Sequence, residues 1–306
     1  MPTIVGKQKK AWLGPPMILD DDMTEEELSD LIWKGTEDQR RAVAKHLNTS
    51  LRTLRDLADM GFAEEVDQNP LMLLYVEAGS DEVVLILMRL AQQTIRTERL
   101  EELSCSVFQD VRQSVVWNEK TPVKILNVLA KEQNVFVRRG VAGNKNTPPE
   151  ILDALSLDEY EIVRISVAKN TSTSARTLQI LSKDNFEGVR RGVASNENAP
   201  ADILNILSKD YDEDVRSEVA QNKSTYPEIL DRLARDENTY VRRTVARNEN
   251  TSQCVLEQLS KDEVPSVRIN VASNKNVPQH ILEILACDSE ASVKNFAQSI
   301  KDRKNT

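Results

Sequence analysis

Residues 137–162 read VRRGVAGNKNTPPEILDALSLDEYEI, and this 26-residue stretch is one copy of a unit that the chain repeats. Seven copies follow one another without insertion from Val111 to Ser292. Because a unit this short cannot bury its own apolar face, it must stack on its neighbours. The register therefore predicts an elongated helical solenoid. The copies open with a valine–arginine pair at Val111, Val137, Val163, Val189, Val215, Val241 and Val267.

The first part of each unit has the spacing of a short helix. Val137 and Val141 lie four residues apart and therefore share one side of that helix, while Ala142 lets a neighbouring helix come close. Arg138 and the arginine after it are expected to face away from this side. We expect the helix to end at Asn144, a residue type that tolerates the left-handed conformation at a helix end.

The second part of each unit predicts a second short helix. Thr147 is expected to cap it, with Pro148 in the first turn and Glu150 completing a capping box. Its apolar stripe is built from leucines that recur in every copy. At one position these are Leu126, Leu152, Leu178, Leu204, Leu230, Leu256 and Leu282, and at the next Leu129, Leu155, Leu181, Leu207, Leu233, Leu259 and Leu285.

The motif VRxxVAxNxNTPxxILxxLS, which covers residues 111–292, resembles the repeat of the leucine-rich repeat variant family. The resemblance implies an all-α solenoid, a right-handed superhelix of short helix pairs, with the second helix partly 3₁₀ and no β-sheet. One branch of that family carries an amino-terminal cysteine cluster that holds an iron–sulfur centre. This chain has no cysteine before Cys105, so we expect no cofactor and no metal.

The register divides the chain into four parts. Residues 1–22 are expected to form an extended arm, and residues 23–110 an acidic helical region with degenerate repeats. Residues 111–292 are the seven repeats, and residues 293–306 a capping helix that seals the last open face.

Within the degenerate region, residues 39–58 align with the repeat, and His46 occupies the asparagine position. Leu100 and Leu103 are the clearest remnant of a further copy. A capping box that begins at Thr24 predicts a helix that ends near Gly35.

Composition indicates a helical protein of the cytoplasm. Aromatic residues make up 4% of the chain and charged residues 29%. The three cysteines lie far apart, as expected of free thiols in a reducing compartment. The longest apolar run, residues 83–88, is too short to cross a membrane, and no signal peptide is expected. Residues 1–110 hold 12 Lys/Arg against 21 Asp/Glu, whereas residues 111–306 hold 28 of each, which disfavours nucleic acid as a partner.

Three polar ladders run along the repeats. The arginines could bind phosphates or an acidic peptide, or each could pair with an acidic residue; the equal regularity of the two ladders favours pairing. The asparagines could bind a peptide backbone, but such side chains more often satisfy the repeat's own loops. The ladders are Arg112, Arg138, Arg164, Arg190, Arg216, Arg242 and Arg268; Glu132, Asp158, Asp184, Asp210, Asp236, Asp262 and Asp288; and Asn118, Asn144, Asn170, Asn196, Asn222, Asn248 and Asn274.

A second arginine follows the ladder arginine in every other unit, and pairing explains it less easily. The units between them place Ile165, Ser217 and Ile269 at that position, so we predict a surface of cations and exposed isoleucines. Trp117 stands at a position that varies between units; it is either a partner anchor or, as we favour, the point where the N-terminal region docks. The predicted partner-binding residues are Arg139, Arg191, Arg243, Ile165, Ile269 and Trp117.

Catalysis has little support in the sequence. The chain has two histidines, His46 and His280, and neither lies in a nucleophile, phosphate-binding or metalloprotease motif. We predict a non-catalytic, monomeric scaffold that binds a protein or peptide partner along its concave surface. The alternative is a nucleic-acid-associated, HEAT-like protein that uses the arginine ladder.

Overall fold

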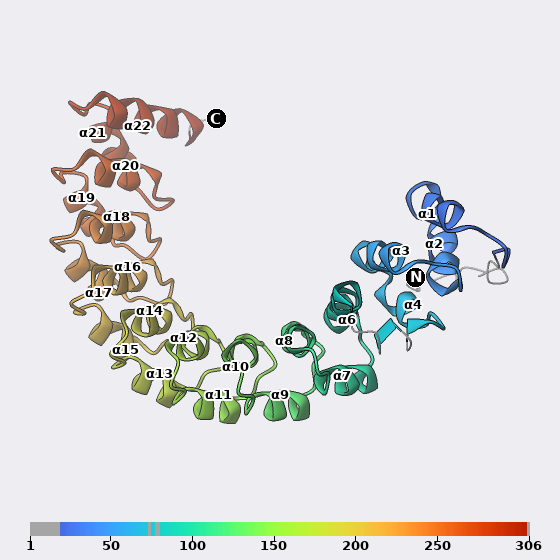
Figure 1. Ribbon diagram of the computed structural model, residues 1–306. Helices are drawn as coiled ribbons and strands as arrows, with labels where there is room; N and C mark the ends of the chain where they lie inside the picture. Colours follow the sequence, from blue (N-terminus) through green and yellow to red (C-terminus); the bar gives the residue numbers. More distant parts are fainter. Residues whose placement is uncertain (1–18, 73–74, 77–79, 305–306) are drawn as a thin grey trace, which may run out of the picture. The chain divides into compact units, whose positions relative to one another are not determined.

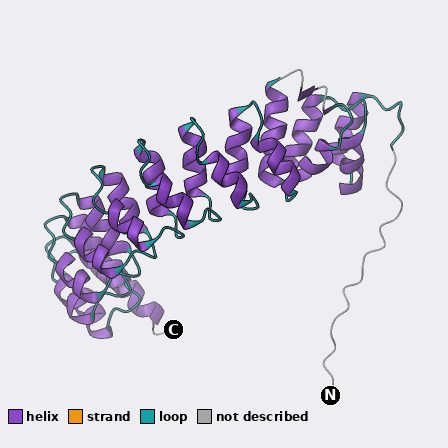
Figure 2. Ribbon diagram, turned by 90° about the horizontal axis from the view of Figure 1, so that it is seen from below, coloured by secondary structure: helices purple, strands orange, loops and turns teal. Residues whose placement is uncertain are grey.

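The computed structural model describes residues 19–72, 75–76 and 80–304. Most of the expected N-terminal arm, residues 1–18, lies outside this range. Throughout the described ranges every regular element is a helix, and none is a strand (Figure 2). The chain forms two compact units, residues 1–125 and 126–306. The division falls within helix α9 (Val123–Leu129), and the four-part division drawn from the sequence stays a prediction.

The unit of residues 126–306 is built from two rows of helices (Figure 1). The first helices are α10 (Val135–Gly143), α12 (Glu161–Lys169), α14 (Glu187–Ser195), α16 (Glu213–Gln221), α18 (Thr239–Arg247) and α20 (Pro265–Ser273). The second helices are α11 (Pro149–Leu155), α13 (Ala175–Leu181), α15 (Ala201–Leu207), α17 (Pro227–Leu233), α19 (Gln253–Leu259) and α21 (Gln279–Leu285).

The packing of the two rows gives this unit its curve. Each first helix packs directly beside the first helix of the next repeat, whereas the second helices pack mainly on the first helices that flank them. The first-helix row is therefore the tighter one and lies on the inner side of the curve (Figure 1). The last element, α22 (Ala291–Lys304), is one longer helix that packs on α20 and α21.

The repeat leucines and valines form a continuous core. Val137, Val141 and Leu152 have no exposed surface, and Leu155 is 4% exposed. Each buried aliphatic side chain contributes about 1.5–3 kcal/mol. Because part of this burial comes from the next repeat, the core is shared between neighbours rather than owned by one unit.

The asparagine ladder holds successive repeats together. The Asn196 side-chain amide donates to the carbonyls of Ala168 and Asn170 in the preceding repeat, at 2.8 and 2.9 Å, and its oxygen accepts the backbone N–H of Asn198 at 2.9 Å. The same amide bonds recur at Asn170, Asn222, Asn248 and Asn274. The structural interpretation of this ladder is therefore confirmed.

Two local expectations about the caps are wrong. Asn144 ends α10 in an extended conformation (φ −71°, ψ 129°), not a left-handed one, and its side-chain oxygen accepts the backbone N–H of Asn146. Thr147 does not cap α11; Pro148 is the N-cap residue, and no side-chain capping bond is formed there. The Thr147 hydroxyl instead donates to the carbonyl of Val141, which ties the end of the first helix to the start of the second.

The unit of residues 1–125 contains looser versions of the same helix pair. The capping box at Thr24 is present, and the helix that it opens ends at Gly35, as predicted. A segment with π-helical bonding, Ala58–Phe62, is broken at Gly61, whose φ of +97° suits only glycine. The helices are α1 (Glu25–Lys34), α2 (Glu37–Lys45), α3 (Leu51–Leu57), α4 (Ala63–Asp67), α6 (Asp81–Gln93), α7 (Thr97–Ser104) and α8 (Gln109–Trp117).

His46 takes over the role of asparagine in this unit. Its Nδ1 accepts the backbone N–H of Asn48 at 3.1 Å, so the neutral ring carries its proton on Nε2, which donates to the carbonyl of Asp20 at 2.9 Å. The ladder continues through Asn69, which donates to the carbonyls of Ala44 and His46. The sequence reading missed Asn69 because its spacing from His46 is shorter than the 26-residue period.

No helix among the described residues has the length and apolar character needed to cross a membrane.

We expect Leu204→Ala to lower the free energy of unfolding by about 2–5 kcal/mol, because it opens a cavity in a fully buried site. Ile206→Ala on the same helix is the matched control, since Ile206 is 48% exposed. Urea unfolding followed by circular dichroism measures both. Equal midpoints for the two variants would contradict the core described above.

Candidate binding surface on the first helices

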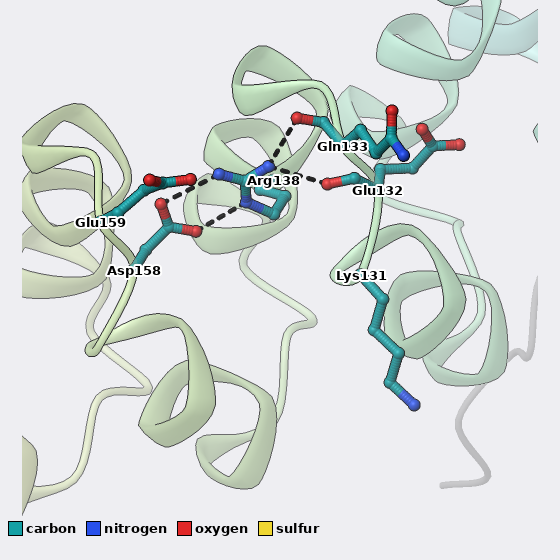
Figure 3. Close-up of a pocket in the computed structure, with 6 residues that line it drawn as sticks. All are labelled: Lys131, Glu132, Gln133, Arg138, Asp158 and Glu159. Carbon is teal, nitrogen blue, oxygen red and sulfur yellow. Dashed lines mark hydrogen bonds and ion pairs between the residues drawn. The ribbon is translucent and has the colours of Figure 1, made fainter.

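The ladder arginines are fully engaged inside the protein. Arg138 donates from Nε and Nη2 to the two carboxylate oxygens of Asp158 in the next repeat, at 2.6 and 3.0 Å. Its Nη1 donates to the carbonyls of Glu132 and Gln133, both at 2.8 Å (Figure 3). The same two-pronged pairing joins Arg164 to Asp184, Arg190 to Asp210, Arg216 to Asp236, Arg242 to Asp262, and Arg268 to Asp288. The predicted pairing is confirmed for these six arginines.

Charge and hydrogen bonding in these pairs reinforce each other. The hydrogen bond to Asp158 raises the pKa of Arg138, although partial burial opposes the rise. The hydrogen bond from Arg268 holds the pKa of Asp288 below its usual range. Aromatic rings lie over three of the guanidinium groups, with Tyr160 5.7 Å from Arg138, Phe186 5.6 Å from Arg164 and Tyr211 4.6 Å from Arg190. This edge of the unit is therefore a seam between repeats.

A hollow of about 460 Å³ opens at this seam (Figure 3). Lys131, Glu132, Gln133, Arg138, Asp158 and Glu159 line it. Its central guanidinium already has a partner on each side, and carboxylates flank it. The hollow therefore has little capacity to bind an additional anion.

The position that follows the ladder arginine on each first helix faces outward, and its arginines are not held in such internal pairs. We call the outward side of α10, α12, α14, α16, α18 and α20 the first-helix surface. Arg139 is exposed on it and has no hydrogen bond or ion pair with any described residue. Arg191 lies 3.5 Å from Asp214 of the next repeat, with both side chains about half exposed. Arg243 stacks over Tyr240 at 5.4 Å.

The isoleucines of this surface are less exposed than the sequence suggested. Ile165 and Ile269 are half-buried, and Ser217 is buried. Ile165 packs against the next repeat: its Cδ1 would lie 3.2 Å from a Cβ added at Gly188. The expectation of exposed isoleucines is therefore wrong in degree: both side chains are half-buried, and Ile165 packs against the neighbouring helix α14.

Trp117 belongs to the unit of residues 1–125 and is described apart from the other five predicted residues. It is the last residue of α8 and is 48% exposed. Both interpretations, partner anchor and docking point of the N-terminal region, stay predictions.

Sequence reasoning missed one feature of the first-helix surface, a hollow of about 480 Å³ beside α18. Arg243 and Arg247 both line it, and their spacing of four residues could have revealed it, since it places two cations on one helix face. The other lining residues are Gln221, Tyr240, Thr244 and Asn248. We call this the Arg243–Arg247 hollow.

Comparison with known proteins tests the repeat interpretation. No protein-family model and no curated protein matches the chain. A solved structure described as a leucine-rich repeat variant with a novel repetitive structural motif is 25% identical in sequence. It matches with a TM-score of 0.52 over 71% of this chain and 86% of that one. The chain has the leucine-rich repeat variant fold.

Two further matches are more distant. The E. coli protein YibA is 16% identical and covers 92% of this chain and 94% of its own, with a TM-score of 0.33. A designed armadillo repeat protein in complex with the peptide (KR)4 is 12% identical and covers 91% and 98%, with a TM-score of 0.18. Neither similarity is close enough to carry an argument about this chain.

The cysteines of this chain do not fit an iron–sulfur centre. Such a cluster is held by about four ligands, usually cysteine thiolates, and the whole chain has three cysteines. Cys105, Cys254 and Cys287 are exposed free thiols. Among the residues that the structure describes, no group of three or more His, Cys, Asp or Glu side chains could hold a metal ion. That the protein is metal-free stays a prediction.

The ladder predicts a pH dependence of stability. Burial of Asp184 raises its pKa, but hydrogen bonds from Arg164 and from the Phe186 amide outweigh burial and leave the pKa lowered. A lowered folded-state pKa adds stability that is present above the unfolded value of about 3.9 and is lost as pH falls through the folded value.

We therefore expect Asp184→Asn to cost about 3 kcal/mol near neutral pH, because it leaves the mostly buried Arg164 without its counter-charge. The difference from wild type should shrink below about pH 4. Urea unfolding at a series of pH values measures it, with Asp202→Asn at an exposed position as the control. A pH-independent difference would show that the charge of Asp184 is not the cause.

Proposed function

We propose that this chain is a non-catalytic repeat scaffold whose first-helix surface binds an acidic, partly apolar peptide or partner helix. The observation that carries the proposal is the contrast between adjacent arginines. Arg138 and its equivalents each form an ion pair with an aspartate of the next repeat, whereas Arg139 and Arg243 lack any carboxylate partner among the described residues. Cations without a carboxylate partner are available to a ligand.

Arg191 fits the same surface although it has a partner. Its contact with Asp214 spans 3.5 Å between half-exposed side chains. Exposed ion pairs contribute about 0–1 kcal/mol and are screened by salt. A carboxylate of an incoming peptide can therefore replace Asp214 at little cost.

The apolar part of the surface lies beside these cations. Phe136 and Tyr240 are each nearly half exposed. The half-buried Ile165 lies on α12, between the helices that carry them, and the half-buried Ile269 lies on α20, the first helix after that of Tyr240. Interfaces commonly combine aromatic residues and arginine at their centre. This mixture favours a ligand with alternating acidic and apolar side chains.

Nucleic acid remains the alternative partner, but the arginine ladder gives it little support. Six ladder guanidinium groups are each held by an aspartate and by loop carbonyls. The first-helix surface has neutral side chains at Ile165, Ser217 and Ile269, where a polyanion would favour a cation in every repeat.

We further propose that the protein works as a monomer in a reducing compartment such as the cytoplasm. Three exposed free thiols suit that compartment, where reductants keep cysteines unpaired. The proposal of a non-catalytic role is supported by the histidines: His46 is engaged in loop hydrogen bonds, and His280 is exposed on α21.

Selection of random peptides displayed on phage tests the proposal. With the full chain immobilised, we expect the selected sequences to be enriched in Asp or Glu next to aliphatic residues. Arg139→Glu combined with Arg191→Glu should weaken the binding of a selected peptide by tenfold or more, about 1.4 kcal/mol. Fluorescence anisotropy measures the affinity.

Arg176→Glu combined with Lys183→Glu is the matched control, because it reverses two exposed charges away from the first helices. An equal loss in both double variants would reject the first-helix surface as the binding site. Tight binding of a DNA duplex at physiological salt, lost on reversal of Arg139 and Arg191, would support the nucleic-acid alternative instead.

A further inference from the structure

The Arg243–Arg247 hollow combines two cations with no opposing charge. The two arginines lie one turn apart on α18, and Gln221 contributes from the neighbouring α16. None of the six lining residues is acidic. Neither arginine has a hydrogen bond or an ion pair with any residue that the structure describes, and Arg243 stacks on Tyr240. Like charges at this spacing destabilise a helix by about 0.2–0.5 kcal/mol.

Comparison between repeats shows that this arrangement is particular to α18. At the position of Arg247 the other first helices of the unit carry Gly143, Lys169, Ser195, Gln221 and Ser273. Only α18, among α10 to α20, has arginine at both outward positions. The counter-charge is also missing here: Asp214 accompanies Arg191, but the equivalent residue after Arg243 is Ser266.

The groups of the hollow that remain for a ligand are rich in hydrogen-bond donors. The Thr244 hydroxyl donates to the carbonyl of Tyr240 and contacts the Ser217 hydroxyl. The Asn248 amide is committed to the asparagine ladder. Both guanidinium groups and the Tyr240 hydroxyl are left, together with the Gln221 amide, and Tyr240 supports the guanidinium plane of Arg243 from one side at 5.4 Å.

We propose that the Arg243–Arg247 hollow binds a phosphoryl group carried by a side chain of the peptide partner. This inference rests on the proposed function and names the ligand chemistry of one part of the same surface. A phosphoryl group carries about −1.5 to −2 charges and three strong acceptor oxygens, which matches two uncompensated cations. A carboxylate carries a single negative charge and would neutralise one of the two.

A phosphorylated peptide fits the surroundings of the hollow better than a nucleic acid does. The flanking first helices place Ser217 and Ile269 at the position of Arg243, so no second pair of cations is available for a neighbouring phosphate. A polynucleotide contributes a phosphate at every nucleotide and favours a continuous basic track. The hollow therefore suits one isolated phosphoryl group.

The repeat supplies substitutions that remove the site and keep the fold. Arg243→Ile introduces the residue found at the same position in α12 and α20, and Arg247→Ser the residue found in α14 and α20. Arg176→Ser, at an exposed position on α13, is the charge-matched control. The probes are three pools of random peptides that are identical except for a central phosphoserine, serine or glutamate.

We expect the immobilised full chain to retain the phosphoserine pool at least tenfold better than the glutamate pool, since charge-assisted hydrogen bonds contribute about 1.5–3 kcal/mol each. Millimolar inorganic phosphate should compete for the site. Arg243→Ile and Arg247→Ser should each abolish the preference, and Arg176→Ser should keep it. Quantitative mass spectrometry of the retained peptides measures the ratio.

Equal retention of the phosphoserine and glutamate pools by wild type would overturn the inference, as would a preference that survives Arg247→Ser. Displacement of the phosphoserine pool by a single-stranded oligonucleotide at far lower concentration than by inorganic phosphate would identify a nucleic-acid site instead. If acidic peptides bind through Arg139 and Arg191 without a phosphoserine preference, this inference fails and the proposed function stands. If phosphoserine binds but acidic peptides do not, the proposed function fails.

Discussion

The hydrogen bonds of the ladder asparagines to the preceding repeat are the interaction on which the rest of the structure depends. A unit of two short helices leaves its loop carbonyls and one apolar face without partners until a neighbour covers them. Asn196 meets the first need, because it is almost fully buried and donates to the carbonyls of Ala168 and Asn170 across the interface that the valines and leucines cover. The arginine–aspartate pairs add a second link at the edge of the same interface. Neighbouring repeats are thereby held in a fixed register.

This register determines which side chains remain available for a partner. Successive first helices approach closely enough that a Cβ at Gly192 would lie 2.9 Å from that of Ala168. The asparagine ladder and the arginine–aspartate pairs engage the polar residues that recur in every repeat. The residues available to a partner are therefore at positions where the repeats differ from one another. The outward arginines and the Arg243–Arg247 hollow are such positions. Among the described residues, Arg139, Arg243 and Arg247 have no carboxylate partner, and the packing of the repeats does not explain why these positions are arginine.

The sequence was sufficient to predict the fold in residues 111–292, because periodic valines and leucines specify the packing of each unit on the next. It was less informative about caps: a threonine before proline suggested a capping role for Thr147, whereas the hydroxyl bonds to Val141. In the degenerate region, Asn69 could not be recognised as a ladder asparagine, because its spacing from His46 is shorter than the 26-residue period. Exposure was the hardest property to predict, since whether Ile165 faces solvent depends on Gly188 in the next repeat. Whether a carboxylate pairs with Arg243 likewise depends on the three-dimensional structure, and none of the described residues does so.

Native-state hydrogen exchange of the intact chain tests most directly whether the buried asparagines hold neighbouring repeats together. Asn196→Ala is compared with Asn198→Ala, since Asn198 also bonds to the preceding repeat, at the carbonyl of Thr171, but from an exposed position. The account predicts that Asn196→Ala lowers amide protection in both α12 and α14, on the two sides of the interface, and that Asn198→Ala changes it little. Equal protection in the two variants, or a loss confined to the loop around residue 196, would contradict it.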